Sequence, residues 1–226
     1  MIHEQEEISV AQEFAAFVAD NSFPCVGAKA ALMQDGLSTI EAGDICSSED
    51  DHKIRDALIQ QATQVDFEEG APKSFAVLFK ESPDLDEAAF ETVLWERLSG
   101  LSNIDIQKGT PWSSHSSSDA SQPHYAMSVG GHPYFVIGLH PRASRAARRF
   151  SRCALVFNSH QQFDAMRADG RYQRFQSINR ERELRAFGTI NPMLRDFGTA
   201  SEASQYSGRL VDEAWVCPMA KDVAHD

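Results

Sequence analysis

The sequence has few cysteines, and no pattern ties them together. Its 226 residues include four cysteines. They lie far apart and form no CxxC pair, so a zinc ribbon or a thioredoxin-like redox site has no support. These residues are Cys25, Cys46, Cys153 and Cys217. No internal repeat and no Pro/Gly-rich linker divides the chain. We therefore expect one compact domain over residues 1–226.

Long apolar runs and leader sequences are also missing. No stretch approaches the roughly 20 apolar residues that a membrane-spanning helix needs. The N-terminal stretch MIHEQEEISVAQEF is acidic and lacks the basic segment and apolar run of a secretory signal. We therefore expect a cytoplasmic protein that does not bind membranes and keeps its thiols reduced.

The common catalytic motifs and a net basic charge are absent as well. No P-loop, GxGxxG, GxSxG or HExxH motif occurs, so the usual nucleotide, hydrolase and zinc-protease interpretations have no support. The net charge of −12 argues against a general nucleic-acid binder. Residues 142–185, however, hold eleven arginines and four acids. This local positive excess in an acidic chain predicts a buried or concave anion site.

What the sequence does contain is an alternation of helical and strand periodicity. Helical spacing of apolar residues is found over residues 10–18, 54–65 and 90–98. Apolar runs of strand length occur at residues 74–80, 134–139 and 153–158. Ser9 and Gln12 have capping-box spacing, and a second helix is expected to hold Pro24 in its first turn and to end at Gly36. The pattern predicts an α+β domain with a small mixed sheet flanked by helices.

The strand predicted at residues 134–139 leads into a histidine and several arginines, in the stretch HPRASRAARRF. A helix here would align Arg142, Arg145 and Arg149 on one face. Guanidinium groups match carboxylates and phosphates in a planar fork. A solvated basic face is the alternative, but the apolar strand just before it favours a ligand site.

Further candidate residues follow a second predicted strand or lie near the ends of the chain. His160 in FNSHQQF follows the strand CALVFN, as His140 follows its own strand. A lone histidine is more often structural, yet two in equivalent positions near arginines indicate a site. Cys25 would lie in a first helical turn, which lowers a thiol pKa, although a small buried hydrophobe is the alternative. Asp196 and Glu202 could bind a cationic substrate, or could belong to a hydrogen-bonded loop that closes the fold.

Several spaced blocks between residues 23 and 218 are distinctive, and they read FPCVGAKAAL, GLHPRASRAARRF, FNSHQQF, INPMLRDFG, SEASQYSGR and WVCP. Together these blocks resemble the YqcI/YcgG family and, within it, the heme-dependent guanidine N-hydroxylases. The resemblance implies a heme b monooxygenase that acts on a guanidino nitrogen of a small substrate such as L-arginine or a derivative. It also implies dioxygen as a substrate. Because no flavin or nicotinamide motif is visible, the electrons would come from an external donor.

The resemblance also suggests roles for the candidate residues. His140 or His160 would be the axial ligand of the heme iron, with His140 preferred because its block is richest in arginine, and Cys25 as a thiolate alternative. Asp196 and Glu202 would recognise the guanidinium group. The arginines expected to bind the heme propionates are Arg142, Arg145 and Arg149.

Two other classes of function remain open at this point. One is a non-catalytic protein that uses the arginine-rich segment to bind an anion, or that binds heme as cargo or as a sensor. The other is a structural partner whose arginine face docks on an acidic surface, in a salt-sensitive manner.

Overall fold

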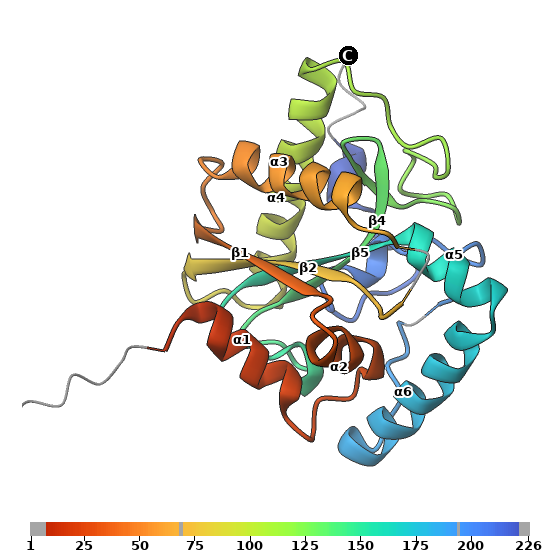
Figure 1. Cartoon of the computed structure of the whole chain (residues 1–226). Helices are drawn as coiled ribbons and strands as arrows, with labels where there is room; N and C mark the ends of the chain where they lie inside the picture. Colours follow the sequence, from red (N-terminus) through yellow and green to blue (C-terminus); the bar gives the residue numbers. More distant parts are fainter. Residues whose placement is uncertain (1–7, 68–69, 194, 222–226) are drawn as a thin grey trace, which may run out of the picture.

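The centre of the structure is a five-stranded mixed sheet with the order β1-β2-β5-β4-β3 (Figure 1). The computed structural model describes residues 8–67, 70–193 and 195–221. Strands β1 and β2 are parallel, and the other neighbours are antiparallel. The strands are β1 (Leu37–Asp44), β2 (Ser74–Glu81), β3 (Met127–Val129), β4 (His132–Leu139) and β5 (Ala154–Ser159). The α+β class expected from the sequence is confirmed.

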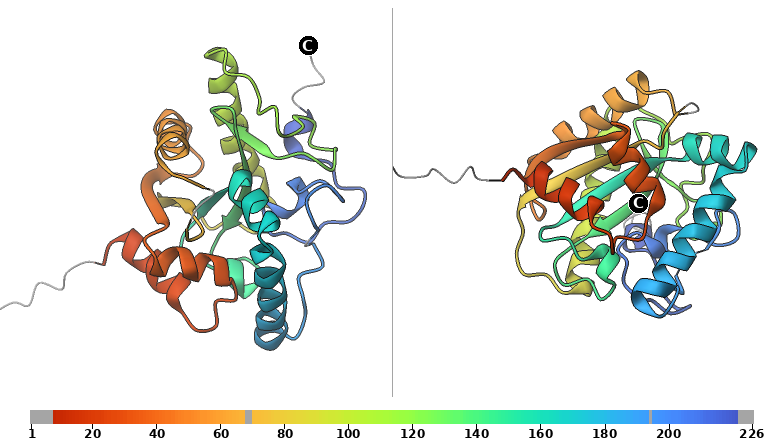
Figure 2. Two further views of the ribbon diagram at one scale, coloured as in Figure 1. Left: turned by 45° about the vertical axis from the view of Figure 1, so that its right-hand side comes forward. Right: turned by 60° about the horizontal axis from the view of Figure 1, so that its bottom comes forward.

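Helices cover both faces of this sheet. Helices α1 (Val10–Ala19) and α2 (Val26–Met33) lie on one face, and α3 (Asp51–Gln64) and α4 (Glu87–Gln107) lie on the other (Figure 1). The remaining helical elements are α5 (His160–Ala168), α6 (Arg171–Phe187), η1 (Ala146–Arg148), η2 (Ala203–Gln205) and η3 (Pro218–Lys221). Helix α6, the last long helix, runs beside α2 (Figure 2). In the part of the chain that the structure describes, no helix is long and apolar enough to cross a membrane.

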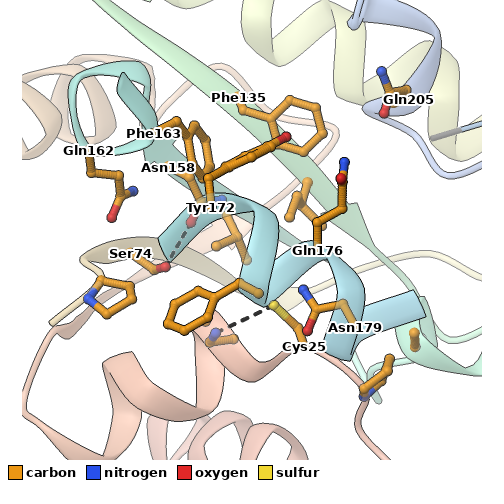
Figure 3. A pocket seen from close by; sticks show the side chains of 18 of the residues that line it. Cys25, Ser74, Phe135, Asn158, Gln162, Phe163, Tyr172, Gln176, Asn179 and Gln205 are labelled. Carbon is orange, nitrogen blue, oxygen red and sulfur yellow. Dashed lines mark hydrogen bonds between the residues drawn. The ribbon is translucent and has the colours of Figure 1, made fainter. Parts of the chain in front are cut away.

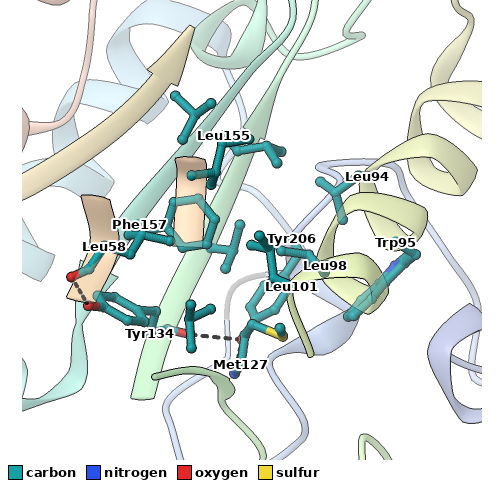
Figure 4. Close-up of a cluster of buried hydrophobic side chains, with 14 of the residues drawn as sticks. Leu58, Leu94, Trp95, Leu98, Leu101, Met127, Tyr134, Leu155, Phe157 and Tyr206 are labelled. Atoms are coloured by element: carbon teal, nitrogen blue, oxygen red, sulfur yellow. Dashed lines mark hydrogen bonds between the residues drawn. The ribbon is translucent and has the colours of Figure 1, made fainter. Parts of the chain in front are cut away.

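The alternation of side chains along the strands builds a separate core on each face of the sheet. In β2, Phe75, Val77 and Phe79 join the cluster that faces α3 and α4, whereas Ala76 and Leu78 join the cluster that faces α1. Figure 4 shows the first cluster, in which residues of α4 pack against β4 and β5. The face toward α1 and α2 therefore carries the smaller core.

The N-terminal helices show how local sequence sets their ends. Helix α1 begins as expected, because the Ser9 hydroxyl accepts from the Gln12 N–H and the Gln12 side chain accepts from the Ser9 N–H. Helix α2 begins later than expected. Cys25 is its N-cap, with Sγ accepting from the Ala28 N–H at 3.4 Å. Pro24 therefore precedes the cap instead of lying in the first turn.

The arginine-rich segment after β4 is a loop with the short η1 turn, so its arginines do not share a helical face. The backbone N–H of His140 donates to the Arg148 carbonyl at 3.1 Å. Arg149 donates from Nε to the Ala143 carbonyl and from Nη2 to the Ser144 carbonyl. These bonds across the loop occupy groups that an α-helix would pair along its axis.

Gly138 in β4 has no room for a side chain. A Cβ there would lie 2.6 Å from Leu94 Cδ1 and 2.7 Å from Phe90 Cε1. We expect Gly138→Ala to lower the free energy of unfolding by about 1–3 kcal/mol, because overpacking forces core side chains from their rotamers. Gly43→Ala in β1 is the control, since its Cβ would meet Asp50 Oδ2 at an ordinary 3.4 Å. The control should change stability by about 0.5 kcal/mol or less. Equal losses in urea unfolding would contradict this packing.

Candidate functional site

A cavity of about 350 Å³ lies between α6 and the sheet face that also carries α1 and α2. Along β4 the side chains alternate, so Phe135 and Ile137 point to this face, and Val156 of β5 joins them. Tyr172 and Phe175 line it from α6. Figure 3 shows Phe135, Phe163 and Tyr172 around this space. The walls are therefore largely apolar and aromatic, as is usual for pockets that bind small molecules or cofactors.

Neutral amide side chains interrupt these apolar walls. The Gln162 side chain accepts from the Lys73 N–H and donates to the Lys73 carbonyl, both at 2.8 Å. Asn179 of α6 accepts from the Val26 N–H at 2.7 Å, which ties α6 to the first turn of α2. The amides that line the cavity and are labelled in Figure 3 are Asn158, Gln162, Gln176, Asn179 and Gln205. They join the elements of the wall and offer uncharged donors and acceptors to a ligand.

A buried histidine and carboxylate pair lies at one end of the cavity. His160 Nε2 is 3.1 Å from Glu202 Oε1, and the Tyr206 hydroxyl donates to the same oxygen at 2.6 Å. Both His160 and Glu202 are almost fully buried. With Nε2–H donated to Glu202, Nδ1 is the ring nitrogen left to bind a metal or to accept a proton. The carboxylate thus fixes both the orientation and the tautomer of the imidazole.

Burial sets the protonation of this end of the cavity. Desolvation raises the pKa of Glu202, and the hydrogen bonds from His160 and Tyr206 oppose this rise. Burial also raises the pKa of Tyr206 well above its ordinary value, with the nearby Glu202 charge adding to the effect. The phenol is therefore neutral at physiological pH and remains a hydrogen-bond donor to Glu202.

Three of the residues singled out from the sequence as site candidates, together with Cys25, line the cavity. These are His160, Asp196 and Glu202. Asp196 is exposed, and its Oδ1 accepts from Gln176 Nε2 of α6 at 2.6 Å. Burial raises the pKa of the Cys25 thiol, which favours its protonated form in this structure. The segment that carries Asp196 and Glu202 both closes the fold and contributes to the cavity.

His140, the preferred iron ligand from the sequence, is not among the residues that line the cavity. Its ring stacks on Phe90 of α4, with 4.3 Å between the ring centres. Phe90 belongs to the core on the opposite face of the sheet. Burial lowers the pKa of His140, and within the described chain its buried Nδ1 has no hydrogen-bond partner. The geometry therefore favours His160 as the imidazole of the cavity.

The three arginines expected to bind propionates also lie outside the cavity lining. Arg142 is exposed and pairs with Asp84 at 3.3 Å, and Arg149 is bound to loop carbonyls. Arg145 forms an ion pair with Glu183 of α6. The arginines that line the cavity are instead Arg148 of this loop and Arg167, Arg180 and Arg195 from later in the chain, and Glu183 lines it as well. No sequence signal separates Arg148 from its neighbours, because only the course of the loop decides which arginine turns inward.

The cavity falls within the region shared with a known protein family. The sequence profile of the YqcI/YcgG family matches residues 14–220. The chain belongs to the YqcI/YcgG family. Its curated relatives include the uncharacterized protein YcgG of Bacillus subtilis (strain 168), which is 25% identical over 185 residues, or 79% of this chain and 72% of YcgG. No solved structure matches the chain. Every residue that lines the cavity lies within the part matched by the YqcI/YcgG profile.

The raised pKa of Glu202 predicts a pH dependence of stability. Above the ordinary glutamate pKa of about 4.3, the folded chain keeps a proton that the unfolded chain releases. The free energy of unfolding should therefore fall as the pH rises through the interval up to the raised pKa. Glu202→Gln does not titrate and should lack this fall, which amounts to at most about 1.4 kcal/mol per pH unit. Urea unfolding at a series of pH values measures both proteins, and parallel profiles would contradict the assignment.

Proposed function

We propose that this protein is a heme-dependent monooxygenase that hydroxylates a guanidino nitrogen of a small substrate such as L-arginine or a derivative. The observation that carries this proposal is the cavity, in which aromatic walls meet a buried imidazole oriented by a carboxylate. A heme protein needs both features, because the macrocycle is apolar and its iron takes an axial ligand from the protein.

The residues around the cavity fit a heme b group. Phe135 of the sheet and Phe175 of α6 supply apolar surface on opposite walls. His160 would hold the iron, with Glu202 as the partner that orients the ring. Arg148 is a cation on the cavity lining and would bind a propionate. The Cys25 thiol also lines the cavity and is the alternative axial ligand.

When bound, the heme supplies the oxidation: one oxygen atom of dioxygen enters an N–H bond of the guanidino group, and the other leaves as water, with two electrons from an external donor and two protons. The chain's own residues bind and orient. Asp196 would hold the guanidinium through charge-assisted hydrogen bonds. Glu202 Oε1 already accepts from two donors, so its part is to hold the imidazole.

A non-catalytic protein that binds heme or another anion is the second candidate. It is favoured by Arg148, because this cation lines the cavity and forms no ion pair with the carboxylates of the described residues. Oxygen-dependent formation of an N-hydroxyguanidine by the heme-loaded protein, in the presence of a reductant, distinguishes the two. A protein that binds heme without turnover would be a carrier or a sensor.

The first test of the proposal is the identity of the iron ligand. The wild type, purified with heme or after addition of hemin, should show a Soret absorption band with near-stoichiometric iron. His160→Ala should lose the heme or shift its absorption and resonance Raman spectra, because it removes the imidazole of the cavity. His140→Ala is the matched control and should keep the wild-type spectrum, and Cys25→Ala tests the thiolate alternative. A wild type that stays colourless and iron-free after hemin addition would sink the monooxygenase proposal.

The second test concerns Asp196, the protein carboxylate that is proposed to bind the substrate guanidinium. We expect Asp196→Asn to weaken equilibrium binding of L-arginine by about tenfold to a hundredfold, because a charged hydrogen bond to the guanidinium is lost. Glu181→Gln removes an exposed carboxylate of α6 that does not line the cavity, and it should bind like the wild type. Isothermal titration calorimetry measures all three proteins. Equal affinities for wild type and Asp196→Asn would remove Asp196 from the site.

A further inference from the structure

Arg148 reaches the cavity from the loop after β4 and is held there by main-chain carbonyls. Its Nη1 donates to the carbonyl oxygens of Gly138 at 3.0 Å and Tyr206 at 2.9 Å, and its Nη2 donates to that of Gln205 at 2.9 Å. These acceptors are neutral, so they orient the guanidinium without cancelling its charge. Among the described residues these three bonds leave two of its five N–H groups for a further acceptor.

The charges around Arg148 do not balance. Glu183 is the acid that acts on Arg148 electrostatically, but it already forms an ion pair with Arg145 and accepts from the Asn191 N–H at 3.0 Å. Two guanidinium groups therefore share one carboxylate at this end of the cavity. Burial lowers the pKa of Arg148 to about 10, which still leaves it protonated at neutral pH. The result is a net positive charge beside apolar walls, where an unpaired charge is costly.

This positive end lies well away from His160. Arg148 binds the carbonyl of Gly138, whereas His160 follows Ser159, whose partner in β4 is Tyr134. Four strand residues, or roughly 13 Å, therefore separate the two backbone positions. His160 and Arg148 thus line different parts of the cavity. The guanidinium near His160 is that of Arg167, which is paired with Asp164 at 2.7 Å, whereas Arg148 is held by neutral carbonyls.

We propose that Arg148 forms a carboxylate-binding subsite in the part of the cavity away from His160. The planar fork of a guanidinium suits a carboxylate, and the two unused N–H groups supply the donors. The carboxylate could come from a heme propionate, in which case the subsite rests on the proposed function, or from a free small molecule. The chemistry of recognition is the same for both sources.

Matched pairs of ligands test this subsite on the wild-type protein without any measurement of activity. The first pair is iron-free protoporphyrin IX and its dimethyl ester, which lacks the propionate charges. The second pair is L-arginine and agmatine, which is the same guanidine without the carboxylate. We expect the carboxylate member of at least one pair to bind about tenfold to a hundredfold more tightly.

The pair that discriminates identifies the source of the carboxylate. A preference for protoporphyrin over its ester indicates a propionate, and a preference for L-arginine over agmatine indicates a free carboxylate. The second result would support the subsite even if no porphyrin binds, so failure of the heme proposal and failure of the subsite are separate outcomes. Equal affinities within both pairs, or no binding of either carboxylate, would overturn the subsite.

Variants then assign the preference to Arg148. Arg148→Met should abolish the preference, and Arg148→Lys should retain part of it, because the charge remains while the fork is lost. Arg149→Met is the matched control, since this neighbour also binds carbonyls but does not line the cavity. Arg148→Met leaves three carbonyls without their donor, so its folding is checked by circular dichroism. If a folded Arg148→Met kept the full preference, Arg148 would not be the subsite.

Discussion

Hydrogen bonds of Tyr206 join the sheet to the segment that carries Glu202. The Tyr206 hydroxyl accepts from the Met127 N–H of β3 at 3.0 Å and donates to Glu202 at 2.6 Å, while the Tyr206 carbonyl accepts from the Gly138 N–H at 2.8 Å. These bonds attach the segment after α6 to the sheet and hold Glu202 against His160. All of these polar groups are buried, where a lost partner costs more than at the surface. The orientation of the imidazole thus depends on a tyrosine from the C-terminal part of the chain.

The two faces of the sheet are used in different ways. On the face toward α3 and α4, large side chains such as Trp95 and Phe157 fill the space between the sheet and the helices and form a continuous core. On the other face, α1 covers β2 and part of β5, but the strand ends near Phe135 and Asn158 face α6 across the cavity. One sheet therefore provides both a tightly packed support and a wall with room for a ligand.

Much of the fold follows from local patterns in the sequence. The start of α1 at Ser9 is correct because capping chemistry acts over a few residues. The segment from Arg142 to Arg149 is different, since bonds between residues several positions apart replace the helix that its spacing suggested. Periodicity cannot report such bonds.

The candidate site was predictable only in part. His160 stood out because it follows a buried strand, and the cavity does contain it. Arg148 looked like any of its neighbouring arginines, and Glu183 lies in a very polar helix where a charge normally faces solvent. Their positions depend on how α6 and the loop after β4 meet, which is a property of the tertiary structure alone.

The exposure of α6 has a consequence for how ligands and folding are linked. All seventeen residues of α6 are described, and Glu183 alone among them is buried. The aromatic side chains of Tyr172 and Phe175 border the cavity. Any molecule bound there packs between α6 and the sheet and becomes part of the interior on this face of the sheet. Its binding free energy then adds to the free energy that holds α6 against the sheet. Filling of the cavity by a ligand and the order of α6 should therefore increase together.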